Sequence, residues 1–181
     1  AVEVGALLTI QSSRSLKTLI KAQMLDVSNT AAAMLDGDSL EWLTPEDAGT
    51  PEYRAVMDTL TYFQDNIALK YIYCIRDMGN KNFVFGLDST VLDPGEFGEP
   101  VVYTDALYAA SLGTAAVDER AYEDAWGKFY SAYTPVFNSE GRVAGIVAVD
   151  FSADWYEHEI AKRSGTILFI SVLSLLMGIV I

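Results

Sequence analysis

The end of the chain holds the segment that most restricts how the protein can fold. Residues 166–181, TILFISVLSLLMGIVI, contain no charged side chain. A helix that crosses a bilayer needs about 20 predominantly apolar residues, and a helix that is apolar on every side otherwise needs a large domain to bury it. We therefore expect residues 166–181 to form most of a transmembrane helix, with a buried core helix as the alternative.

The residues near this segment leave its orientation open. Lys162 and Arg163 precede it, and two such charges favour a cytoplasmic domain only weakly under the positive-inside rule. A second apolar stretch, VGALLTI at residues 4–10, lies beside Glu3 near the other end of the sequence. This stretch is a weaker candidate for the end of an earlier membrane span.

The net charge of −13 excludes one class of partner. Residues 36–125 carry 18 acidic side chains against 5 basic ones, so the excess negative charge lies in the middle of the chain. Proteins that bind DNA or RNA neutralise the phosphate backbone with Lys and Arg. We therefore expect no nucleic acid among the partners of this protein.

A single cysteine and a single histidine limit the chemistry that the chain can perform. Cys74 has no second cysteine with which to form a disulfide, and His158 is the only imidazole. A catalytic triad or a histidine-based metal centre would have to be built on that one residue. Asp36 and Asp38 flank a glycine but lack the rest of a calcium-binding loop. We expect no metal site and no cofactor.

The spacing of apolar residues predicts two helices in the first third of the chain. From Leu16 onward they recur at steps of three and four, which predicts a long amphipathic helix over residues 1–35. Thr50 followed by Pro51 is typical of a helix start, and the same apolar spacing continues for about 15 residues after it. We expect a second helix there.

Two strand pairs follow, each around a turn-forming segment. Residues 70–77 and 82–88 are rich in aromatic and β-branched side chains, and residues 128–137 and 142–151 repeat the arrangement. We expect two antiparallel hairpins and, with the helices, the α+β class. The intervening residues 89–127 are mostly irregular, and a long segment of this kind more often covers a binding site than serves as a spacer.

The last strand runs almost directly into a C-terminal helix. Ser152 is a suitable N-cap, and residues 153–165 are expected to form a juxtamembrane helix of roughly 20 Å that could transmit a displacement of the sheet. The expected organisation is a long N-terminal helix, a central domain, the juxtamembrane helix and the membrane segment, at residues 1–35, 36–152, 153–165 and 166–181.

Short motifs in a definite order carry a resemblance to a known family. They are TPEY at 50–53, YIY at 71–73, FVFGLD at 83–88, DPGEFG at 93–98, WG at 126–127, SAYTPV at 131–136 and GIVAVD at 145–150. Over about residues 10–155 the chain resembles a single Cache domain, the PAS-like extracytoplasmic sensor of bacterial and archaeal signalling proteins. The resemblance implies a PAS-like antiparallel sheet, with the long N-terminal helix on one face and a ligand pocket on the other.

The resemblance also implies a function. A Cache domain is the extracytoplasmic, ligand-sensing part of a receptor in the cell membrane and is not an enzyme. We expect a small-molecule ligand such as an amine or amino acid, and a homodimer formed through the N-terminal helix. We expect the signal to pass through the membrane helix to an output module absent from this chain, namely a diguanylate cyclase, a histidine kinase or a chemoreceptor.

Strand alternation and the resemblance together select candidate site residues. Asp150 shares its strand face with Ala148, so its carboxylate needs a partner such as a ligand ammonium group. Asp88 ends its strand in a comparable place, on the face of Val84 and Gly86. In the family, the aspartate that ends the final strand and nearby aromatic residues often line the pocket. The candidate ligand-binding residues are Tyr73, Asp88, Tyr103, Trp126, Tyr133 and Asp150.

Each candidate also has a purely structural interpretation. Asp150 could pair with Arg76 or Arg120 inside the domain, and Tyr73 and Tyr133 could fill the core with their hydroxyl groups satisfied. Two alternative functions stay open as well. One is a dimerising ectodomain that binds no ligand, and the other is a membrane-tethered hydrolase that depends on carboxylates.

Overall fold

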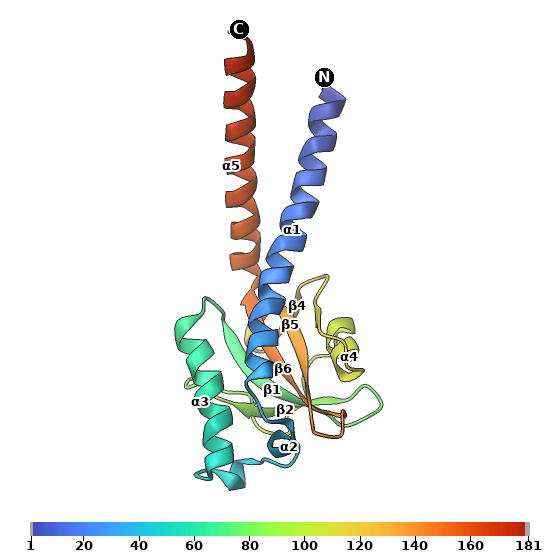
Figure 1. The fold of residues 1–181 in the computed structure, drawn as a ribbon, viewed down its shortest axis with the longest axis vertical. Helices are drawn as coiled ribbons and strands as arrows, with labels where there is room; N and C mark the ends of the chain where they lie inside the picture. Colours follow the sequence, from blue (N-terminus) through green and yellow to red (C-terminus); the bar gives the residue numbers. More distant parts are fainter. Residues whose placement is uncertain (1, 180–181) are drawn as a thin grey trace.

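A computed structural model describes the backbone of residues 2–179 and the side chains of residues 14–166, 169–170 and 172–173 (Figure 1). The chain forms an antiparallel sheet with helices around it, in the order α1 (Val2–Ala33), α2 (Gly37–Leu40), the 3-10 turn η1 (Pro45–Asp47), α3 (Pro51–Asn66), β1 (Tyr71–Asp77), β2 (Phe83–Asp88), α4 (Asp105–Ser111), β3 (Ala116–Val117), β4 (Tyr122–Asp124), β5 (Gly127–Phe137), β6 (Val143–Ser152) and α5 (Ala153–Ile179).

The sheet is built around the two predicted hairpins. Its strand order is β2-β1-β6-β5-β3, and β4 also pairs with β5. Every strand pairing is antiparallel. The β1–β2 turn contains Gly79, Asn80 and Lys81, all with positive φ. The predicted α+β class, with an antiparallel sheet and a long N-terminal helix, is confirmed.

Helices α1 and α3 cover one face of the sheet. Buried side chains of α1 such as Ile20 and Met24 share one apolar core with Leu60 of α3. Every second residue of the central strands joins them: Ile72, Cys74, Ala132, Val147 and Val149. This arrangement confirms that the long N-terminal helix packs on one face, because the strand period of two gives that face a continuous apolar surface.

The opposite face carries the alternate residues of the same strands. Tyr73 and Tyr133 lie there, with a second buried cluster that includes Leu107 of α4. Thr104 accepts a hydrogen bond from Leu107 N at 3.0 Å and so caps the start of α4. The segment between β2 and β5, which the sequence predicts to be mostly irregular, therefore adds a short helix to this face.

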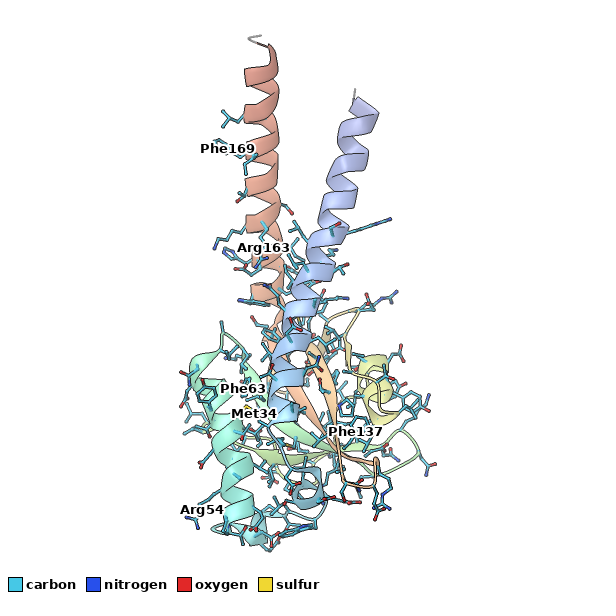
Figure 2. All side chains as sticks on the ribbon, in the orientation of Figure 1. Met34, Arg54, Phe63, Phe137, Arg163 and Phe169 are labelled. Carbon is cyan, nitrogen blue, oxygen red and sulfur yellow. The ribbon has the colours of Figure 1, made fainter. Side chains whose placement is uncertain are left out.

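Helices α1 and α5 leave the sheet at the same end and run side by side (Figure 1). Arg163 of α5 donates a hydrogen bond to Gln23 of α1 at 3.4 Å, and Figure 2 shows Arg163 on the part of α5 near α1. Strand β6 ends at Ser152 and α5 begins at the next residue. The expected juxtamembrane helix is therefore the first part of one continuous helix.

The expected membrane segments fall partly outside the described residues. The backbone of residues 166–181 is described only to residue 179, and most side chains of this stretch and all those of residues 4–10 are not described. Phe169, which is described, is 69% exposed on α5 (Figure 2). Within the part of the chain that the structure describes, no helix is both long enough and apolar enough to span a bilayer.

Candidate functional site

A small cavity lies on the sheet face that points away from α1. Strands β1, β2, β4 and β6 and the loop after β2 enclose it, and its volume is about 10 Å³. That is room for about one water molecule, so any larger ligand requires the loop to move. The lining residues are Tyr71, Tyr73, Phe85, Asp88, Thr90, Asp93, Gly95, Asp124, Trp126 and Asp150.

Asp150 is the most deeply buried acid of this cavity. Its side chain is 2% exposed, and it lies opposite Ser131 in the β5–β6 ladder. Ser131 Oγ donates to Asp150 Oδ1 at 2.5 Å, and the Tyr122 hydroxyl donates to the same oxygen at 3.4 Å. Burial raises the pKa of Asp150 to about 7, although the bond from Ser131 opposes the shift. Among the described residues, no ion pair joins this carboxylate to a cation.

A second buried acid, Asp118, is linked to the first through the same serine. Asp118 is 3% exposed and accepts hydrogen bonds from Ser131 N at 3.1 Å and from the Tyr133 hydroxyl at 3.4 Å. Burial raises the pKa of Asp118 to about 6. The negative charge of Asp118 also raises the pKa of Asp150. Ser131 thus joins two carboxyl groups that both hold protons more tightly than an exposed aspartate does.

Aromatic rings form another part of the cavity lining. The rings of Tyr73 and Phe85 have centroids 4.8 Å apart, and Trp126 meets Phe85 edge-on at 5.5 Å. Trp126 Nε1 donates to the backbone carbonyl of Asp93 at 2.9 Å, which ties the indole to the loop after β2. Aromatic faces beside carboxylates form an environment that attracts organic cations.

Asp88 shapes the loop that closes the cavity. Its two carboxylate oxygens accept hydrogen bonds from Thr90 N at 2.8 Å and Gly95 N at 2.9 Å. A Cβ on Gly95 would lie 2.4 Å from the Phe85 ring, so only glycine lets the loop lie this close. The Thr90 hydroxyl is buried and has no hydrogen-bond partner among the described residues. The loop therefore brings an unused hydroxyl group to the cavity.

The structure brings four of the six candidate residues together. Tyr73, Asp88, Trp126 and Asp150 line the cavity, from four different parts of the chain. Their role in ligand binding stays a prediction. Arg76 is one expected partner of Asp150. Its guanidinium group instead donates to the backbone carbonyls of Leu40, in α2, and of Leu43, just after it.

The other two candidates lie elsewhere. Tyr133 is fully buried, and its hydroxyl group binds Asp118, which agrees with the structural interpretation of this residue. Tyr103 is 39% exposed, donates to Asp105 at 3.2 Å and borders a separate groove beside α4. Neither residue lines the cavity.

A β-bulge explains an error in the predicted faces. In the β1–β2 ladder Tyr73 pairs with Asp88 but Ile75 pairs with Phe85, so two residues of β2 oppose Cys74. The bulge turns Leu87 into the core beneath α1 and Asp88 into the cavity. The expectation that Asp88 shares a face with Val84 and Gly86 is therefore wrong, because strict alternation does not survive a bulge.

Sequence reasoning also missed several lining residues. Tyr71 is two positions from Tyr73 on one strand, so the strand period could have identified it. Thr90, Asp93 and Gly95 belong to a loop whose path depends on the two bonds to Asp88. The remaining missed residues are Phe85, on the far side of the bulge, and Asp124, in a strand of three residues.

Among the described residues, neither a metal-binding cluster nor the single histidine lies at the cavity. Across the described residues, no group of three or more His, Cys, Asp or Glu side chains could hold a metal ion. His158 lies on α5 and does not line the cavity. The chemistry present is that of carboxylates, hydroxyl groups and aromatic rings, which suits reversible binding.

Comparisons with known proteins identify the fold. No family model matches the chain, and no curated protein matches its sequence. Similar solved structures include the ligand-binding domain of the Campylobacter jejuni chemoreceptor Tlp3 in complex with L-valine, at a TM-score of 0.56 and 15% identity over 85% of this chain and 61% of that one. The complex of the same domain with L-norvaline gives a TM-score of 0.57 at 16% identity, over 85% of this chain and 59% of that one.

The Tlp3 sensory domain with isoleucine bound gives a TM-score of 0.52 at 15% identity, over 85% of this chain and 60% of that one. This chain thus spans about three fifths of the length of the domains that it matches. At such low identity the likeness concerns the fold. The chain has the fold of Cache-type sensory domains, as the resemblance of its sequence predicts.

Proposed function

We propose that this chain is the extracytoplasmic ligand-sensing domain of a membrane-bound signalling receptor, and that it binds a small polar or amine-bearing ligand around Asp150. The observation that carries the proposal is the position of this acid. Asp150 is buried, lines a cavity and is paired with no cation among the described residues. It also lies on β6 three residues before α5 begins.

The ligand supplies the positive charge with which the Asp150 carboxylate can pair. An ammonium group beside the carboxylate compensates the cost of ionising an acid inside the protein. The loop of residues 89–95 is fastened to Asp88 and rests on the Phe85 ring, so a ligand beneath it shifts the loop as well. The ligand shifts the domain toward the conformation in which its charge is better paired. The size of that shift is set by the difference between its affinities for the two conformations.

The output passes through β6 to α5. No loop separates the two elements, so a shift of Asp150 along or across the sheet moves the start of α5. Helix α5 lies beside α1, and both leave the sheet at the same end (Figure 1). We place these two helices toward a membrane, because residues 166–181 carry no charge. A cyclase, kinase or chemoreceptor module would read their displacement, in a homodimer formed through α1.

The solved structures support this class of function by analogy. The chemoreceptor domain Tlp3 has been solved with L-valine, isoleucine, L-norvaline and 4-methylisoleucine bound. Those compounds are small and carry an amino group. The comparison supports amino-group recognition as the common element for this chain, without fixing the rest of the ligand.

A thermal-shift screen of the 181-residue protein tests the proposal. The panel contains amino acids, amines, organic acids and nucleobases. A ligand present at a hundredfold excess over its Kd stabilises the folded state by about 2.7 kcal/mol. We expect a hit whose shift is lost in Trp126→Ala and kept in Tyr62→Ala, since Tyr62 is exposed on α3 away from the cavity. A panel without any hit would favour a structural ectodomain.

The membrane and dimer parts have their own test. Single cysteines placed along α1 in a Cys74→Ser background should cross-link between copies in cell membranes. A protein that is washed from membranes by alkaline carbonate, or that never cross-links along α1, contradicts this part of the proposal. The ligand-binding part would stand independently.

A further inference from the structure

We propose that the cavity selects a small organic ammonium ion that carries no carboxylate, and so discriminates against free α-amino acids. This inference rests on the proposed function, since it narrows the ligand of the same site. It follows from which charges line the cavity and from which hydrogen-bond donors are already in use.

Every charged side chain that lines the cavity is acidic. Asp88, Asp93, Asp124 and Asp150 all contribute to it, and no lysine, arginine or histidine does. An α-amino acid brings one positive and one negative group into such a space. Its ammonium group finds several partners, but its carboxylate meets like charges and no compensating cation.

Four backbone donors at the cavity are also occupied. Thr90 N and Gly95 N donate to Asp88, and Trp126 N and Gly127 N donate to Asp124 at 2.9 and 3.1 Å. These are the groups that would otherwise hold a ligand carboxylate. The Thr90 hydroxyl could donate one bond to such a carboxylate, but no cation among the described residues lines the cavity, so burying the anion there is strongly unfavourable.

The remaining groups suit a cation. Tyr71, Tyr73, Phe85 and Trp126 supply aromatic surface, and the Thr90 hydroxyl is a buried oxygen with no partner among the described residues. A cation already approaches one of these rings, since Lys70 Nζ lies 5.4 Å from the centroid of Tyr71. An ammonium ligand can thus combine an ion pair with Asp150, a hydrogen bond to Thr90 and contact with aromatic faces.

The size of the cavity restricts the ligand further. Its volume is about 10 Å³, and the loop over it is held by the contact of Gly95 with Phe85. Room for a ligand comes from displacement of that loop. A branched amine of a few carbons requires less displacement than an amino acid of the same skeleton, which also has to fit its carboxylate against Asp124 or Asp88.

Calorimetric titration with matched probes tests the inference. Isobutylamine is L-valine without its carboxylate, and L-valinol replaces that carboxylate by a hydroxymethyl group. With the 181-residue protein we expect both amines to bind at least about tenfold more tightly than L-valine, a difference of about 1.4 kcal/mol. Binding of L-valine as tight as that of either amine would overturn the inference and leave the sensor function in place.

Two variants make the test independent of any single substitution. Asp150→Asn should weaken isobutylamine at least about tenfold, since an amide cannot ionise to pair with the ligand ammonium group. Asp93→Asn removes an exposed charge at the rim and keeps a residue type that tolerates the φ of 56° found there. Asp93→Asn should reduce the ratio of the affinities for isobutylamine and L-valine by a few-fold. An unchanged affinity ratio would contradict the inference that the negative charge of the lining disfavours a ligand carboxylate.

The outcomes separate this inference from the proposed function. If neither amine nor L-valine binds while another compound of the screen does, the inference fails and the sensor function stands. If no compound binds to a well-folded protein, both fail. If the amines bind but Asp150→Asn binds them equally well, the cavity is the wrong site for the selection described.

Discussion

The two faces of the sheet are made by the same strands but have opposite character. On β1, Ile72 packs under α1 while Tyr73 faces the cavity. On β6, Val149 packs under α1 while Asp150 lies on the cavity side. The α1 face is predominantly apolar, and the cavity face holds tyrosines, phenylalanines and acids. Neighbouring residues of one strand therefore belong to different faces, one to the core under α1 and the next to the cavity side.

The difference between the two faces indicates which of them can gain free energy from a bound ligand. The α1 face stabilises the domain through apolar burial, and its side chains are already packed against the helices instead of being available to a ligand. The cavity face keeps Asp118 and Asp150 buried, and among the described residues no ion pair joins either acid to a cation, which is unfavourable for the folded protein. A cationic ligand can recover part of that cost. The face that stabilises the domain less is the one that can respond to a ligand.

The largest effect is expected from a truncation on the α1 face. Ile72 is fully buried, and Ile72→Ala should lower the free energy of unfolding by about 2–5 kcal/mol through lost burial and the cavity left behind. Urea denaturation measures it. The ligand affinity of the protein that remains folded should be unchanged, and a loss of affinity greater than that of Trp126→Ala would break the separation of the two faces.

The second prediction concerns pH and the cavity face. Folded Asp150 keeps its proton up to a pH of about 7, whereas its ordinary pKa is 3.8. Between these values the folded state binds more protons than the unfolded state, so the free energy of unfolding falls as pH rises from about 4 to about 7 and then levels off. Asp118 acts in the same direction up to a pH of about 6.

The slope approaches about 1.4 kcal/mol per pH unit for each such group. Urea denaturation across this range checks it. Asp150→Asn should flatten the upper part of the profile and raise stability near neutral pH. A stability that rises between pH about 5 and about 7 would contradict buried, unpaired acids on this face.

The third prediction concerns the loop over the cavity. In Gly95→Ala the new methyl group would lie 2.4 Å from the Phe85 ring, so the loop or the ring has to shift. We expect a loss of about 1–3 kcal/mol of stability together with weaker ligand binding. Gly165→Ala on α5, where nothing lies within 4 Å, is the control and should stabilise slightly. Equal ligand affinity in both variants would show that the loop does not close the site.

The smallest effects are expected from two helix caps. Thr50 caps α3 by accepting a bond from Tyr53 N at 3.2 Å, and Thr104 caps α4 in the same way. Replacing either by alanine should cost about 1 kcal/mol. Only Thr104→Ala lies on the cavity side of the sheet, so only this variant should also alter ligand binding. A calorimetric melt with and without ligand distinguishes the two.

Much of the fold could be predicted from the sequence because its signals are local. The helix start at Thr50 and the two hairpins depend on neighbouring residues, and the structure has each of them. Alternation likewise placed Asp150 with Ala148 on the face away from α1. Such patterns need only a strand of ordinary period, which β6 provides.

The rest of the site depends on contacts between distant residues. The bulge opposite Cys74 moves Asp88 to the cavity, and no local pattern in FVFGLD reveals it. Asp118 becomes buried only because β5 supplies Ser131 N beside it. Ser131 itself could have been found, since the register of the second hairpin sets it opposite Asp150. Tyr133 shows the reverse case, a correct face but a hydroxyl group directed to another acid.

The ionisation of Asp150 is the most direct test of the contrast between the two faces. The ¹³C chemical shift of its carboxyl group can be followed by NMR against pH, with Asp150→Asn used for assignment. The account predicts a midpoint near 7 in the ligand-free protein, as burial without a cation requires. A midpoint near the ordinary value of 3.8 would mean that the acid is solvated or paired, and the cavity would lose the property on which ligand recognition depends.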